Sequence, residues 1–124
     1  MSNSSLFLNL FRNKETKNAT AGWYVFKAGD PGNCMYVVME GEVEILDGST
    51  SLEIVGPGAI FGELALIDDE PRSATAVAKT DARLVEVDRR RFEFMVTETP
   101  FFALAVMKVL ADRLRRTNAR IRAN

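Results

Sequence analysis

Closely spaced turn signals divide the middle of this chain into stretches too short for most helices. Gly29 to Asn33, Glu40-Gly41, Asp47-Gly48 and Gly56 to Gly58 interrupt the apolar stretches that follow Trp23. Glycine tolerates the positive φ of tight turns, and Asp-Gly between two apolar stretches is a strong hairpin signal. Such spacing is typical of a β-sandwich or barrel.

The stretches between these turns have the periodicity of strands. Glu42 to Ile45 alternates polar and apolar side chains, which is the period of a half-buried strand. On this basis we expect strands over residues 35–39, 42–46, 51–55, 74–78 and 82–87.

Helical patterns lie on both sides of this β-rich region. Apolar residues at helical spacing predict a short helix over 4–15, which a loop over 18–21 follows. Asp88 can cap a helix over 89–97. Thr99 can cap a longer helix over 100–122, with Pro100 at its first position, where a missing N–H has no cost.

Together these elements predict one fold class, mainly β with flanking helices. We expect an antiparallel β-roll of the jelly-roll type (a double-stranded β-helix) over 22–87, with a short N-terminal helix and two C-terminal helices. The 124 residues suit a single domain, 1–124, with one core.

Composition excludes several classes of function. The chain has no histidine and one cysteine, Cys34, so it offers no histidine general base, no His-ligated zinc and no internal disulfide. A formal net charge of −1 provides no overall attraction to nucleic acid. No apolar run is long enough to span a membrane, and residues 1–18 lack the pattern of a signal peptide. We therefore expect a cytoplasmic protein without a bound metal.

The most informative segment is Gly56 to Ala76, which combines groups suited to a nucleotide. Arg72 offers a planar fork of donors that fits two phosphate oxygens. Glu63 could accept a hydrogen bond from a sugar hydroxyl, and Gly62 allows a ligand to approach the backbone. An isolated Glu and Arg are more often a surface ion pair, so the argument depends on the surrounding segment.

That segment resembles the phosphate-binding cassette of the cyclic-nucleotide-binding domain family. The family pattern F-G-E-L-A-L, a short spacer and P-R-x-A-T corresponds to Phe61–Leu66 and Pro71–Thr75, which places the cassette at 61–75. The turns and strands of 26–43 and the helix entry Val87-Asp88-Arg89 extend the resemblance over nearly the whole chain.

The resemblance implies a role for each matching residue. Glu63 would accept from the ribose 2′-hydroxyl, and Arg72 would pair with the exocyclic phosphate oxygens. Backbone N–H groups near Leu64, Ala65 and Ser73 would complete the phosphate pocket, with Gly62 near the ribose and Phe61 beside it in the motif. Binding is expected to move the C-terminal helices in a sensor without enzymatic activity.

The last helix is similar to that of the family's bacterial transcription regulators, in which a Thr-Ser pair meets adenine. Thr117 and Asn118 occupy the matching positions, with Asn replacing Ser. Together with Ser73 they favour cAMP over cGMP as the ligand. The chain stops at Asn124, where those regulators continue into a DNA-binding domain, so we expect a stand-alone domain that signals through an unidentified downstream protein.

The same helix carries an apolar seam that predicts a homodimer through 100–122. Its spacing of 3 and 4 is that of a and d positions, with Asn118 at an a position, where a buried Asn sets register. The seam consists of Leu104, Met107, Ala111, Leu114, Asn118 and Ile121. A second stripe, Phe102, Val106, Val109 and Leu110, could pack on the β-roll. Alternatively, the helix only covers its own β-roll.

Other interpretations of the site remain open. A vestigial pocket would leave a structural or protein-interaction module, and a cyclic dinucleotide could replace the mononucleotide. A cupin-like metal enzyme is disfavoured by the missing histidines. Asp68-Asp69-Glu70 could attract a hard cation, although three acids before a proline are more typical of a solvated turn.

Overall fold

The computed structural model describes residues 3–123, which form two compact units. The first unit extends to Phe92 and the second begins at Glu93, so each is described by itself. The first contains the strands and the cassette. The second consists of the end of one helix and all of the next.

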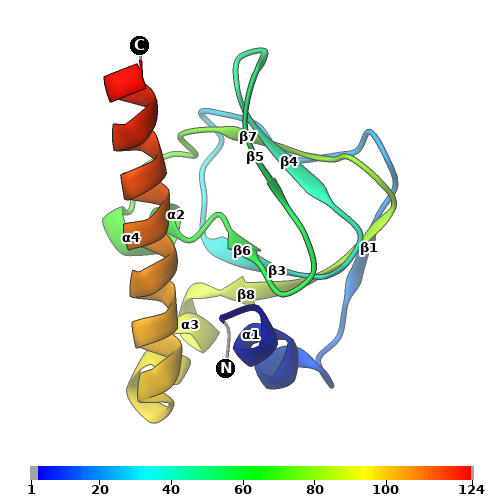
Figure 1. Ribbon diagram of the computed structural model, residues 1–124. Helices are drawn as coiled ribbons and strands as arrows, with labels where there is room; N and C mark the ends of the chain where they lie inside the picture. Colours follow the sequence, from blue (N-terminus) through cyan, green and yellow to red (C-terminus); the bar gives the residue numbers. More distant parts are fainter. Residues whose placement is uncertain (1–2, 124) are drawn as a thin grey trace. The chain divides into compact units, whose positions relative to one another are not determined.

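Two four-stranded antiparallel sheets form the first unit (Figure 1). One sheet has the order β1-β8-β3-β6 and the other β2-β7-β4-β5. The strands of the first sheet are β1 (Lys17–Ala19), β8 (Ala82–Asp88), β3 (Cys34–Glu40) and β6 (Ile60–Phe61). Those of the second are β2 (Tyr24–Phe26), β7 (Thr75–Ala78), β4 (Val43–Asp47) and β5 (Thr50–Val55). Neighbours within each sheet are mostly distant in sequence, as in a β-roll, so the predicted fold class is confirmed.

The core of this unit lies between the two sheets. One cluster of buried apolar side chains joins Val38 and Leu84 of the first sheet to Val43 and Ala76 of the second. Phe61, which ends β6, belongs to the same cluster. The cassette therefore begins directly from the core, and burial of these side chains holds its first residue in place.

The hairpin predicted from Asp47-Gly48 is present. β4 and β5 pair with Asp47 opposite Thr50, so a two-residue loop connects them. Gly48 has φ +60, the conformation that the primed turn of such a loop requires.

The N-terminal segment differs from the prediction in two respects. Helix α1 (Asn3–Phe11) ends four residues before the predicted limit of the 4–15 helix, and Phe7 and Phe11 are fully buried. The 18–21 loop is partly strand, because β1 pairs with the start of β8. The sheet thus begins before the predicted 22–87 region. This pairing joins segments far apart in sequence, which local patterns do not encode.

The other helices agree closely with expectation. Helix α2 (Leu64–Asp68) is the short helix of the cassette, and α3 (Arg89–Glu98) and α4 (Pro100–Ala123) match the predicted 89–97 and 100–122 helices. Asp88 caps α3 as predicted, since its carboxylate accepts a 2.8 Å hydrogen bond from the Arg91 backbone N–H.

Helix α4 has apolar side chains with two different levels of exposure. Phe102, Ala105 and Val106 are buried. The seam residues Leu104, Met107, Leu114 and Ile121 are each at least 60% exposed. The stripe that includes Phe102 therefore has contacts within the chain, whereas the seam residues remain largely open to solvent.

No single helix within residues 3–123 is both long and apolar enough to cross a membrane. Counted together, α3 and α4 reach the required length and composition, but they are separated by a sharp bend.

Gly41 allows a test of backbone packing in the first unit. It has φ +82, and a Cβ there would lie 2.2 Å from the Asp81 carbonyl oxygen. Gly41→Ala should lower the free energy of unfolding by about 2 kcal/mol, because strain adds to the clash. Gly56→Ala is the matched control, since its Cβ would meet nothing within 4 Å. Urea unfolding would measure both, and equal midpoints would contradict this account of the turn.

Candidate functional site

The cassette is a tight loop between β6 and β7 that contains α2. Gly62 follows β6 with φ +81, and a Cβ there would lie 2.7 Å from Nη1 of Arg72 and 3.3 Å from the Phe26 ring. Both the conformation and the close approach favour glycine. Gly62 thus brings the backbone against the side chain of Arg72, ten residues later.

Arg72 is the central side chain of the site. It is only 6% exposed, and it donates 2.7 Å hydrogen bonds from Nη1 to the Gly62 carbonyl and from Nη2 to the Cys34 carbonyl. Its guanidinium lies over the Phe26 ring, 4.1 Å from the centroid, in a cation–π contact. Nε is also buried, and no described residue accepts a hydrogen bond from it. A buried donor without an acceptor is costly, which suits a site that receives an anion.

The glycine-rich turn before β3 fixes the backbone of Arg72. The Arg72 N–H donates to the Asp30 carbonyl, and the Gly29 N–H donates to the Arg72 carbonyl, both at 2.8 Å. A Cβ on Gly32 would lie 2.6 Å from the Ala65 Cβ and 2.7 Å from Nε of Arg72. The turn therefore packs against both α2 and the guanidinium. We predicted this segment as a turn and missed its contact with the site.

Glu63 is the second buried charged residue of the site. It is 2% exposed and directly precedes α2, and its carbonyl accepts a 3.0 Å hydrogen bond from the Leu66 N–H. Within the described chain, Glu63 and Arg72 are the polar or charged residues that are buried. Burying charge is unfavourable unless it is compensated, so this pair on either side of α2 indicates a functional site.

A polar network lies behind Arg72 on the first sheet. Nη2 of Arg72 lies 3.5 Å from the Cys34 sulfur, and the thiol donates to the Glu86 carboxylate at 3.4 Å. Glu86 also accepts a hydrogen bond from Lys17, which lowers the pKa of its carboxyl group. Burial raises the pKa of the Cys34 thiol and that of the Tyr36 hydroxyl. Cys34 is thus a neutral thiol, and its contact with Arg72, 38 positions away, had no signal in the local sequence.

Three aromatic rings form an apolar wall beside the guanidinium. Phe61 stacks on Tyr36 with a centroid distance of 5.2 Å, and Phe26 lies 6.0 Å from Phe61. The Arg72 guanidinium lies over this same Phe26 ring. Of these rings only Phe61 was among the predicted site residues, because the other two come from strands distant in sequence.

The predicted site residues fall into two groups. The cassette residues all belong to the first unit, where Ala65 is buried, Leu64 is 46% exposed and Ser73 is exposed. Thr117 and Asn118 lie on α4 in the second unit, and both are exposed. The Thr117 hydroxyl donates to the Arg113 carbonyl within the helix at 3.0 Å. Their role at a nucleotide base stays a prediction.

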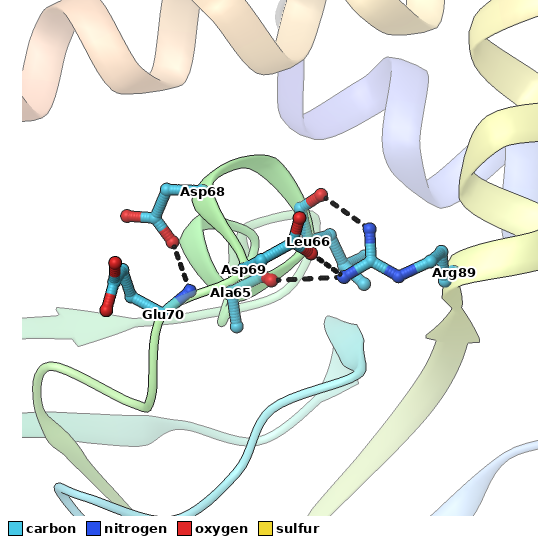
Figure 2. A network of polar contacts seen from close by, with 6 residues as sticks. All are labelled: Ala65, Leu66, Asp68, Asp69, Glu70 and Arg89. Carbon is cyan, nitrogen blue, oxygen red and sulfur yellow. Dashed lines mark hydrogen bonds and ion pairs between the residues drawn. The ribbon is translucent and has the colours of Figure 1, made fainter.

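The acidic turn after α2 has its own polar partners (Figure 2). The Asp68 carboxylate accepts a 3.0 Å hydrogen bond from the Glu70 N–H, and Asp69 pairs with Arg89. Asp69 ends α2 in the left-handed conformation, with φ 58. Among the described residues, no group of three or more Cys, Asp or Glu side chains is arranged to hold a metal ion.

Comparison with known proteins identifies the family. The model of the cyclic nucleotide-binding domain matches residues 16–99. The chain is 38% identical, over 78% of its length, to the CRP-like cAMP-activated global transcriptional regulator of Mycobacterium tuberculosis, and covers 46% of that protein. It is 32% identical, over 88% of its length, to the cyclic nucleotide-gated potassium channel mll3241 of Mesorhizobium japonicum, of which it covers 30%.

Solved structures show the same fold. The catabolite activator protein of Thermus thermophilus superposes with a TM-score of 0.80 at 29% identity, covering 98% of this chain and 58% of that one. The cAMP-bound form of the EAL enzyme Bd1971 gives 0.64 at 36% identity, covering 85% of this chain and 29% of the other. The chain spans less than half the length of the curated relatives named above.

The matched region contains β1 to β8, the cassette and α3. It therefore includes the buried Glu63 and Arg72 and the turn that packs on Arg72. On the family match and on these identities, the chain belongs to the cyclic-nucleotide-binding domain family.

Proposed function

We propose that this chain is a sensor that binds a cyclic mononucleotide, with cAMP as the preferred ligand and cGMP as the alternative. The observation that carries the proposal is the buried guanidinium of Arg72, whose Nε has no acceptor among residues 3–123, and the same segment contains a second buried charged residue, Glu63. A cyclic phosphate would supply acceptors in a bidentate arrangement suited to arginine.

The family pattern supplies the remaining roles. Glu63 would accept from the ribose 2′-hydroxyl, while Arg72 would give up carbonyl contacts in favour of phosphate oxygens. Backbone N–H groups near Leu64, Ala65 and Ser73 would complete the phosphate pocket, with Phe61 and Gly62 shaping its wall. None of these roles is catalytic, so we propose a regulatory rather than an enzymatic domain.

Two features favour cAMP. Ser73 follows the cassette arginine, where the family resemblance implies a preference for cAMP, and Thr117 with Asn118 could meet the base from α4. The name of the M. tuberculosis relative also describes activation by cAMP. The EAL enzyme Bd1971 was also solved with cGMP, and one 23% identical structure is described as responsive to c-di-GMP, so the choice of ligand requires measurement.

The exposed seam of α4 favours a homodimer as the signalling form. Its apolar side chains are spaced as a and d positions and remain largely open to solvent. A change in the position of α4 on binding would then reach an unidentified downstream protein. We place this activity in the cytoplasm, where the single thiol of Cys34 would stay reduced.

Arg72→Ala tests the ligand site. We expect the wild-type chain to bind cAMP with a Kd in the micromolar range, about −8 kcal/mol. Removal of the guanidinium should weaken binding by about a hundredfold or more, because charged hydrogen bonds in a buried site are lost. Titration calorimetry with cAMP and cGMP would measure both and establish the preferred base.

Arg83→Ala is the matched control for that titration. Arg83 is an exposed arginine on β8 that pairs with Glu40, so its removal should leave the Kd unchanged. Wild-type affinity in a folded Arg72→Ala variant would refute the site. Absence of heat with either mononucleotide would refute the sensor proposal and favour a vestigial pocket or a cyclic dinucleotide.

Leu114→Glu tests the dimer. A carboxylate in the middle of the seam should convert a dimer to a monomer, because a charge would be buried without a partner. Asn118→Leu should change the oligomeric state or the base preference, since it alters the polar residue at an a position. Ala119→Glu, exposed and one position off the seam, is the control. Sedimentation velocity would measure the oligomeric state of all three variants, and calorimetry would measure the base preference of Asn118→Leu. A monomeric wild-type chain would contradict the proposed interface.

A further inference from the structure

We infer that Arg89 is the positioning residue that transmits occupancy of the cassette to α3. The inference rests on the proposed function, because it assigns a route by which a ligand held by Glu63 and Arg72 would change the helices that follow. Among the described residues, the partners of the Arg89 side chain are Ala65, Leu66 and Asp69, and not Glu63 or Arg72.

Arg89, the first residue of α3, holds the end of α2 (Figure 2). Its Nη1 donates to the Leu66 carbonyl at 3.1 Å, and its Nη2 to the Ala65 carbonyl at 3.4 Å. The same guanidinium forms an ion pair with Asp69. One side chain therefore reaches three acceptors in the last turn of α2, across 20 or more positions of sequence.

The chemistry of a helix end explains why arginine suits this position. The last carbonyls of a helix lack partners within it and carry partial negative charge. Helix α2 has only five residues, and Asp69 ends it in the left-handed conformation. A planar fork with several donors can satisfy two carbonyls and a carboxylate together, whereas the single ammonium group of lysine cannot match that geometry.

Arg89 connects the end of α2 to the start of α3, so a movement of one helix can be transmitted to the other. Glu63 and Arg72 lie before and after α2, so a ligand bound by both would act on the position of this short helix. Helix α3 starts at Arg89 and continues beyond Phe92, where the first unit ends. A shift of α2 would move all three acceptors, and α3 would have to follow or lose these contacts. Such a difference in contacts between two states is what coupling requires.

The exposed fraction of these side chains bears on how strong the link is. Asp69 is 73% exposed and Arg89 40% exposed, so the ion pair alone would contribute little. The two carbonyl contacts are partly buried. We therefore expect Arg89 to determine how α3 responds to the ligand more than how tightly the ligand binds.

The test is hydrogen–deuterium exchange of α2, α3 and α4 with and without saturating cAMP, paired with calorimetry. Arg89→Gln removes the charge and the fork. We expect its Kd for cAMP to rise by less than about tenfold, while the ligand-induced change in exchange over α3 and α4 falls below about half of the wild-type change. Arg90→Gln, exposed and next along α3, is the control and should behave like the wild type.

Two milder variants cover the case in which Arg89→Gln does not fold. Arg89→Lys keeps the charge but loses the fork, and should reduce the response nearly as much. Asp69→Asn keeps the left-handed conformation, which asparagine tolerates, and removes only the ion pair, so a smaller reduction is expected.

The outcomes separate the two proposals. Wild-type coupling in folded Arg89→Gln or Arg89→Lys, with cAMP bound, would refute the role of Arg89 and leave the nucleotide site intact. Failure of the wild-type chain to bind cAMP or cGMP would refute both. Reduced coupling with retained binding would establish Arg89 as the link.

Discussion

The burial of the Arg72 guanidinium is the constraint on which the rest of the site depends. Burying an ion of this size is costly unless acceptors compensate its donors, and the Gly62 and Cys34 carbonyls supply two acceptors. These carbonyls belong to the cassette and to β3, so one side chain joins the loop to the sheet beneath it. The backbone of Arg72 adds two hydrogen bonds to the turn at Gly29 and Asp30. The hydrogen bonds of Arg72 thus hold the cassette in its position on the sheet.

The sequence predicted the fold well where local patterns determine structure. Turn residues and alternation located five of the strands, and the Asp88 cap and Pro100 located the starts of α3 and α4. The predicted end of α1 and the predicted loop at β1 were wrong, and β1 depends on pairing with β8, more than 60 residues away. Local propensity cannot report such long-range pairing.

The site divides in the same way. The cassette motif singled out Glu63 and Arg72, and both are buried, while their contact with a ligand stays a prediction. Sequence reasoning missed Cys34 and Phe26, which contact the guanidinium, because nothing in their immediate neighbourhood points to residue 72. It also treated Arg89 as part of a helix entry and the acidic turn as merely solvated, although the two are paired. The cassette motif covers only adjacent residues, so it could not predict contacts between segments that are distant in sequence.

The close packing around the guanidinium has an evolutionary consequence. Gly32 and Gly62 each leave space that Arg72 fills, and any Cβ at either position would come within 2.7 Å of its nitrogen atoms. Selection on Arg72 therefore also acts on Gly62 and on Gly32, and Gly32 has no proposed contact with the ligand. In a descendant protein that had replaced Arg72, a Cβ at position 32 would clash only with Ala65. Residues other than glycine would then be better tolerated there. Substitutions at position 32 would therefore indicate that ligand binding had been lost while the fold was still conserved.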